Sequence, residues 1–119
     1  MKLWLDDVRE PWKHGCIGWH WAKTAAEAID VFKTGRVEEA SLDHDLLPEH
    51  YPWNCDSVEQ CVGTGYDVVL WMQENDVWPP LGVKVHSLNP VGRLRMERVI
   101  ERAYMRRIIA RRQSEASKQ

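Results

Sequence analysis

Two carboxylates flank a histidine in Asp43-His44-Asp45, directly after the short apolar run at residues 40–42. Alternate residues of a strand point to the same face, so we expect Asp43 and Asp45 to project together and His44 to project away. Two acidic side chains that converge repel each other unless a cation lies between them or one of them holds a proton. This stretch therefore predicts a functional site at the end of a strand.

Two further strand-like runs, at residues 2–5 and 83–85, also end in polar residues. Asp6-Asp7 follows the first run, and His86-Ser87-Leu88-Asn89-Pro90 follows the second. In open parallel α/β sheets, ligands bind at the edge formed by the carboxyl ends of the strands, so these groups are expected to form one site. A single acidic pair would be interpreted as a solvated turn, whereas two pairs after two apolar strands favour a site. Oxygen ligands suit Mg²⁺, and the predicted ligands of Mg²⁺ or Mn²⁺ are Asp6, Asp7, Asp43 and Asp45.

The remaining polar groups suggest phosphate binding and proton transfer. Asn89 is placed to cap a helix that begins at Pro90, and a helix N-terminus binds phosphate through its unpaired N–H groups. The alternative is a plain helix cap without a ligand. His44 and His86 are the candidate acid/base groups, because an imidazole titrates near neutrality. Asp43 is also a candidate nucleophile. The predicted substrate-binding residues are Arg9, Thr64, Ser87, Asn89 and Arg93. Whether Arg9 folds over the site or stays in solvent is left open.

The elements that must position these residues alternate along the chain. Strands are predicted at 2–5, 17–22, 37–43 and 81–86. Thr24 and Glu27 form a capping box for a first helix that stops at Gly35. Thr64 opens a second helix, and a third is predicted from 90 to about 112. This order indicates a small three-layer parallel α/β domain at 1–113, followed by a flexible tail at 114–119. Residues 47–63 are predicted to form a long loop.

Composition excludes several classes of protein. The chain has 119 residues and a formal net charge of -2, which fits one domain and indicates no particular partner. Three cysteines at non-standard spacings argue against a disulfide framework and against a zinc site. We see no transmembrane or secretory segment, so we expect a cytoplasmic protein without a membrane partner. The arginine-rich third helix also carries Glu97 and Glu101, which makes nucleic-acid binding unlikely and leaves a dimer face open.

The arrangement resembles the receiver domain of two-component signalling. Asp6-Asp7 match its magnesium-binding acids, Asp43 its phosphoacceptor and Ser87 its small hydroxyl residue. The chain departs from that pattern because the helix after the first strand is reduced, the fifth strand with its lysine is missing, and His44-Asp45 is foreign to ordinary receivers. We therefore expect a receiver-like (flavodoxin-like) sheet of about four strands.

A finer resemblance is to the receiver-derived family of cyclic-phosphate-processing domains. Its motifs resemble LWLDDxR, SLDHDL, GTGYDV and VHSxNPVG, which match residues 3–9, 41–46, 63–68 and 85–92 here. The resemblance implies a metal-dependent phosphoesterase that opens a cyclic phosphate on a nucleotide or on an ADP-ribose derivative left by RNA repair, in bacteria or their phages. The alternative is a non-catalytic receiver-like module that binds a phosphorylated nucleotide or takes part in phospho-signalling.

Overall fold

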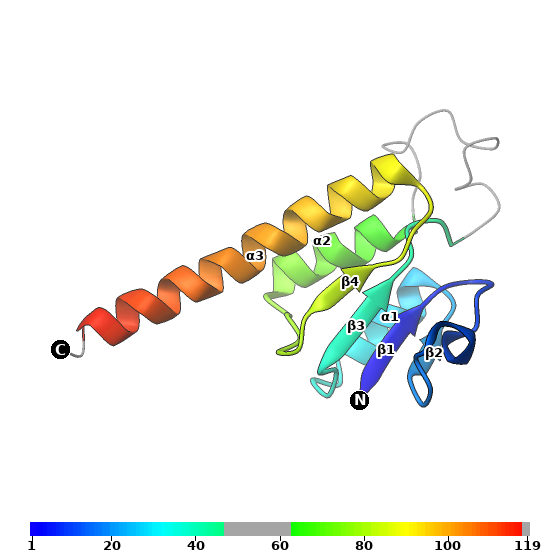
Figure 1. Cartoon of the computed structure of the whole chain (residues 1–119), viewed down its shortest axis with the longest axis horizontal. Coiled ribbons are helices and arrows are strands. Elements are labelled where there is room, and N and C mark those ends of the chain that lie inside the picture. The colour runs from blue at the N-terminus through cyan, green and yellow to red at the C-terminus, as the bar shows by residue number, and fades with distance from the viewer. Residues whose placement is uncertain (47–62, 118–119) are drawn as a thin grey trace.

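A four-stranded sheet, in which all neighbouring strands run parallel, forms the centre of the computed structural model, which describes residues 1–46 and 63–117. Strand β1 (Lys2–Leu5) lies between β2 (His20–Ala22) and β3 (Glu39–Leu42), and β4 (Val83–Val85) pairs with β3 at the edge (Figure 1). The receiver-like α/β class predicted from the sequence is confirmed.

Three strands are shorter than predicted. Strand β2 begins at His20 instead of residue 17, because Gly18 has a φ of 83° and breaks the extended backbone. Strand β4 begins at Val83 for the same reason, since Gly82 has a φ of 107°. Strand β3 spans only Glu39–Leu42, so the acidic residues of the 43–45 segment lie beyond the strand.

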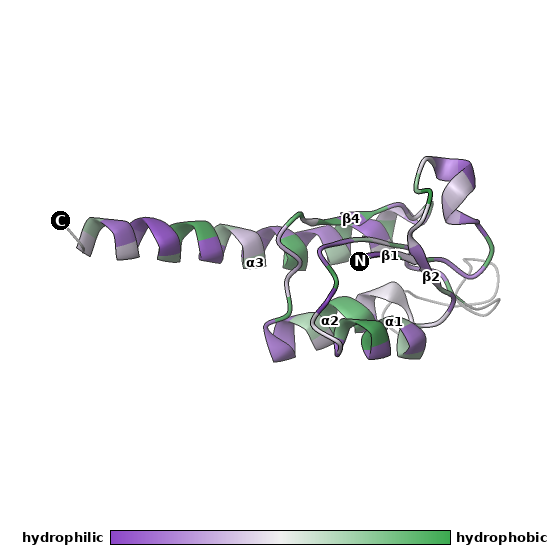
Figure 2. Cartoon of the chain, turned by 90° about the horizontal axis from the view of Figure 1, so that it is seen from below, coloured by the Kyte–Doolittle hydropathy of each residue, from purple (hydrophilic) through white to green (hydrophobic). Residues whose placement is uncertain are grey.

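Helices α1 (Ala25–Phe32) and α2 (Gly65–Asn75) lie together on one side of the sheet (Figure 2). The predicted cap of α1 is present, because Thr24 Oγ1 accepts a hydrogen bond from the Glu27 amide at 3.1 Å. Among the described residues, the other side of the sheet carries a short 3-10 helix, η1 (Pro11–His14), with the segment around it (Figure 2). It occupies the part of the chain where the sequence predicted a reduced first helix.

The core lies between the sheet and the helices. Leu3 and Leu5 of β1, and Ala40 and Leu42 of β3, are fully buried in one apolar cluster with residues of all three α-helices. The period of two along each strand directs these side chains to the helical side. The intervening residues, among them Trp4 and Ser41, therefore face the side of η1.

Helix α3 (Pro90–Ser117) is longer than predicted and runs past the sheet into open space (Figure 1). Its first turns pack against α2 and β4, with Gly92, Met96 and Ile100 buried. Residues 114–117, which the sequence analysis assigned to a flexible tail at 114–119, continue the helix. No helix in the described ranges is both long enough and apolar enough to cross a membrane. The predicted 47–63 loop lies, except for Gly63, outside the described residues.

Candidate active site

Three side chains from three neighbouring strand ends meet at the carboxyl edge of the sheet. Asp6, Asp43 and His86 each offer one ligand atom, and these atoms all lie within 4.8 Å of one another. The sheet ladder places them: the amide of Asp6 donates to Ala22 O at 3.0 Å, and that of Asp43 donates to Leu5 O at 2.9 Å. The amide of His86 likewise donates to the carbonyl of Leu42, the last residue of β3, at 3.0 Å.

Asp6 is held as a carboxylate by several donors. Its Oδ1 accepts the amides of Val8 and Arg9 at 2.9 Å, and its Oδ2 contacts Arg9 Nε at 2.7 Å and His86 Nε2 at 3.1 Å. Burial by itself raises the pKa of Asp6, but the hydrogen bonds from His86 and from the two amides, with the charge of Arg9, lower this pKa to about 2. Asp6 therefore remains charged at any ordinary pH.

Asp43 is in the opposite situation, although it is only one strand away. Burial and the negative charge of Asp6 raise the pKa of Asp43 to about 6, despite the opposing effects of Arg9, His86 and the His44 amide. Its side chain is buried, and its Oδ1 accepts the His44 amide at 2.8 Å. Two neighbouring carboxyl groups with such different pKa values are typical of functional sites.

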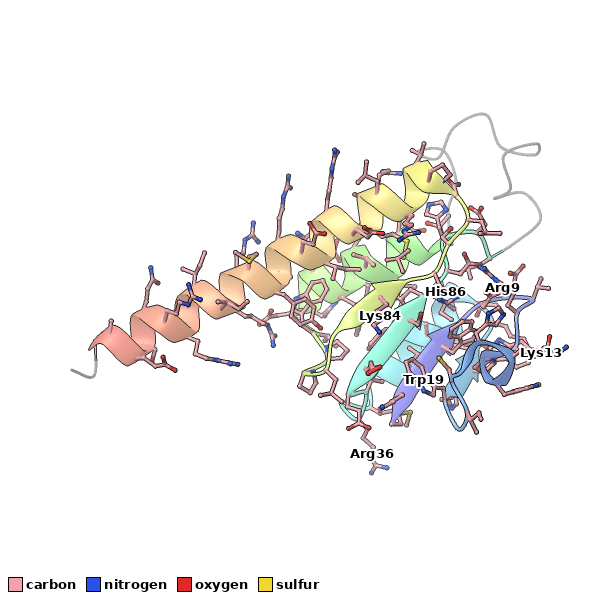
Figure 3. The ribbon with its side chains drawn as sticks, viewed as in Figure 1. Arg9, Lys13, Trp19, Arg36, Lys84 and His86 are labelled. Atoms are coloured by element: carbon pink, nitrogen blue, oxygen red, sulfur yellow. The ribbon has the colours of Figure 1, made fainter. Side chains whose placement is uncertain are left out.

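Arg9 folds back over the two acids, which settles the alternative that the sequence left open. Its Nη2 lies 3.3 Å from Asp43 Oδ2, while its Nε contacts Asp6. Burial lowers the pKa of the guanidinium, but the two carboxylates outweigh this effect and raise it. About 29% of the Arg9 side chain remains exposed to solvent. Figure 3 shows Arg9 and His86 beside the end of β1.

His86 is fixed on both of its ring nitrogens and on one face. Its Nδ1 shares a hydrogen bond of 2.7 Å with Ser41 Oγ, and its Nε2 is hydrogen-bonded to Asp6. Its ring stacks on Trp4 with 3.9 Å between the ring centroids and 5° between the planes, and His14 stacks on the same indole at 5.5 Å. Ser41 and Trp4 were not singled out from the sequence. Trp4 lies two residues before Asp6, and Ser41 lies two residues before Asp43. Their place on the strand face opposite the core is the pattern that could have identified them.

Asp45 does not project with Asp43 as predicted, and it is not part of the three-residue group. Its Oδ1 instead pairs with His44 Nδ1 at 2.7 Å and accepts Asn89 Nδ2 at 3.3 Å. His44 is only 1% exposed. Its Nε2 is buried and has no hydrogen-bond partner within the described residues. The i, i+2 rule failed because β3 ends at Leu42 and the backbone has left the extended conformation at this point.

Two glycines allow the helix N-termini to approach this segment closely. A Cβ on Gly65 would lie 1.9 Å from the carbonyl oxygen of Asp43, and one on Gly92 would lie 2.4 Å from the His44 ring. The amide of Gly65 donates to His44 O at 3.0 Å. Both glycines lie in the sequence motifs, and their role is to press α2 and α3 against residues 43–44.

The remaining predicted site residues differ in their burial and in the contacts that they make. Ser87 is buried, and its Oγ accepts the Asn89 amide at 3.1 Å, while Asn89 Oδ1 caps α3 through the Gly92 amide. Thr64 is buried at the start of α2, but its side chain makes no capping hydrogen bond. Arg93 is exposed and pairs with Glu97. Asp7 is not a member of the described three-residue group.

The fold and the strand-end side chains together define a receiver-like α/β domain in which Asp6, Asp43 and His86 lie close together at one edge of the sheet. The model of one protein family, the cyclic-phosphate processing receiver domain, matches residues 1–102. The chain therefore belongs to this family, as its motifs indicated. No curated protein and no solved structure matches the chain significantly.

Proposed function

We propose that this chain is a metal-dependent phosphoesterase that opens a cyclic phosphate on a nucleotide or ADP-ribose derivative. The observation that supports it best is the pairing of Asp6, ionised down to a pH of about 2, with a buried Asp43 whose pKa is raised to about 6. Two neighbouring carboxyl groups in such different states are typical of catalytic centres. Membership in a cyclic-phosphate processing family supports the substrate class.

A divalent cation fits the residues that are present. Asp6 and Asp43 supply carboxylate oxygens, which suit Mg²⁺ and Mn²⁺. In this proposal Asp6 and Asp43 hold the ion and His86 beside them is left to move a proton, whereas Asp7 and Asp45, the other two ligands expected from the sequence, do not belong to the described group. When bound, such an ion polarises a phosphoryl oxygen and activates water.

The chain's own residues account for the other requirements of the reaction. Water oxygen forms a bond to phosphorus, one P–O bond to the sugar breaks, and the leaving sugar oxygen needs a proton. Arg9 stabilises the charge on the phosphoryl oxygens with its free N–H donors. His86 is the proton carrier, because its Nε2 lies at the acidic group and its ring is 17% exposed. Buried His44 and Asp45 orient Asn89 and the start of α3.

The test is hydrolysis of a panel of 2′,3′-cyclic nucleotides and ADP-ribose cyclic phosphate, followed by phosphorus NMR with Mg²⁺ or Mn²⁺. We expect a phosphomonoester product that disappears when Asp6 or Asp43 is changed to Asn. The matched control is Asp30→Asn, which removes one carboxylate from the exposed face of α1. If the wild type opens no member of the panel with either ion, the proposal is wrong. A rapid quench with mass spectrometry separates attack by water from attack by Asp43, because only the latter leaves an adduct on the protein.

The alternative, a non-catalytic module that binds a phosphorylated nucleotide, is favoured by one observation. Arg9 contacts both carboxylates directly, so the site is partly neutralised by the chain itself. Calorimetry with Asp43→Asn distinguishes the two functions. Unchanged affinity for a cyclic phosphate, together with a wild type that never converts it, favours the binding module.

A further inference from the structure

Most of the outer half of α3 does not pack against the described part of its own chain. The family match ends at residue 102, yet α3 continues to Ser117, and all residues from Met105 to Ser117 are exposed. An isolated helix of this length is marginal in water, because helix stability comes mainly from packing of one face. A second surface is therefore expected to cover this part of α3. Figure 3 shows side chains projecting into open space along it.

Exposed apolar side chains gather on the face of α3 opposite the core. Met96 and Ile100 point to the core, whereas an apolar set on α3 is between 42% and 55% exposed: Val91, Leu94, Met105, Ile108 and Ile109. Positions 91, 94, 98, 101, 105, 108, 112 and 115 follow the alternating steps of three and four that form the seam of a coiled coil. A shallow depression on this face is lined by Arg98, Glu101, Arg102, Met105, Arg106 and Ile109.

The charged residues of this seam are self-complementary in one orientation only. Consider an antiparallel pair of α3 helices centred between Met105 and Ile108. Met105 then lies opposite Ile108 of the second copy, and Ile108 lies opposite Met105 of the second copy. The same register brings Arg98 opposite Glu115 of the second copy, and Glu101 opposite Arg112 of the second copy. A parallel pair in register would place each charge opposite its own kind, which is destabilising.

The four seam charges are also available for such a contact. Within the part of the chain that the structure describes, Arg98, Glu101, Arg112 and Glu115 form no ion pair, although Arg93 and Arg107 on the same helix do. A nucleic acid would fit the arginines, but it would be repelled by glutamates placed within the contact face. A symmetric pair of two copies instead places each arginine of the seam opposite a glutamate.

We propose that two copies of this chain associate through an antiparallel pairing of their α3 helices, along the seam from Arg98 to Glu115. Met105, Ile108 and the flanking Ile109 supply the apolar centre, and four reciprocal Arg–Glu contacts set the orientation. The seam begins at Arg98, more than two turns into α3, and includes none of the residues of the acidic group, so the pairing does not rest on the proposed reaction.

Sedimentation equilibrium of full-length variants, in which seam charges are exchanged, tests the pairing by measuring the dimer dissociation constant. Glu115→Arg places like charges against Arg98 of the second copy, and we expect the dimer dissociation constant to rise about tenfold or more. Arg98→Glu has the same effect. The double exchange in one chain restores the opposite charges by symmetry, and we expect it to recover the wild-type constant. Gln113→Glu, on the side of α3 that faces away from the seam, is the control and leaves the constant unchanged.

Several outcomes would overturn the proposal. A wild type that remains monomeric at the highest soluble concentration has no such contact. A double exchange that dimerises no better than the single variants shows that these charges do not face each other. A monomer that shifts only on addition of a short RNA assigns the face to nucleic acid instead. All substituted residues are exposed, so circular dichroism is expected to show the same folded domain throughout.

Discussion

Replacing Asp43 by Asn is expected to stabilise the metal-free protein while abolishing its activity. Burial and the charge of Asp6 raise the pKa of Asp43 from 3.8 to about 6. Each pKa unit corresponds to about 1.4 kcal/mol, so the ionised Asp43 costs the folded state about 3 kcal/mol at pH 7. Asn has no charge to bury, and its side-chain oxygen still accepts the amide of His44. The variant is expected to gain most of this free energy of unfolding.

The stability of the wild type is expected to depend on pH, because the pKa of Asp43 differs between the folded and the unfolded chain. The folded state of the wild type binds the proton of Asp43 more tightly than the unfolded chain does, so the stability of the wild type falls as pH rises from about 4 to about 6. Asp6 does not contribute in this window, because its pKa of about 2 keeps it charged and its stabilisation is lost only at lower pH. The stability of the Asp43→Asn variant is not expected to fall over this pH range.

Urea denaturation at pH 5 and pH 7.5, with a chelator present, measures the free energy of unfolding of the wild type and of Asp43→Asn, and its dependence on pH. We expect the gap between Asp43→Asn and the wild type to be larger at pH 7.5. Addition of Mn²⁺ at pH 7.5 is then expected to raise the midpoint of the wild type and to leave that of the variant almost unchanged. A variant that is less stable than the wild type at pH 7.5 would refute the assignment of a destabilised carboxylate.

Three further predictions concern the same site. The affinity for Mn²⁺, measured by calorimetry, falls about tenfold per pH unit below the pKa of Asp43 near 6, because the proton competes with the ion. Ser41→Ala removes the 2.7 Å contact to His86 Nδ1, and steady-state kinetics should show kcat reduced about tenfold or more with little change in KM. Gly92→Ala places a Cβ 2.4 Å from the His44 ring, and urea denaturation should show a loss of about 1–3 kcal/mol.

One control serves the two alanine variants. Ser114→Ala lies on the exposed end of α3 and is expected to change neither stability nor kcat by a measurable amount. If Ser41→Ala behaves like this control in the kinetic assay, Ser41 does not position His86. If Gly92→Ala is as stable as the control, the contact between α3 and His44 is looser than the structure indicates. A metal affinity that stays constant between pH 5 and pH 7 would show that Asp43 is not a ligand.

The strands, the helix caps and the acidic edge were predictable because each depends on local sequence. The apolar run of β1, the capping of α1 by Thr24 and the capping of α3 by Asn89 all follow from a few neighbouring residues. The meeting of Asp6, Asp43 and His86 was predictable at the level of strand ends, because parallel strands share one carboxyl edge.

The partners of individual side chains were not predictable in the same way. Asp45 turns to His44 and Asn89 because the backbone is no longer extended after Leu42, and sequence periodicity does not show where a strand ends. His86 was expected as an acid/base group, yet its position within ligand distance of Asp6 depends on support by Ser41 and Trp4 from two other strands. Such support involves residues distant in sequence, so no local pattern contains it.

Arg9 shows why this site can exist before any ligand arrives. Without a cation, two carboxylates within 4.8 Å of each other would oppose folding, and Arg9 supplies a positive charge from only three residues beyond Asp6. Its contact with Asp6 is supported by the backbone turn in which Asp6 accepts two amides. Its contact with Asp43 is longer, at 3.3 Å. Asp43 therefore keeps a raised pKa even beside Arg9, and this incomplete compensation is the physical reason that the proposed function places a second cation at Asp43.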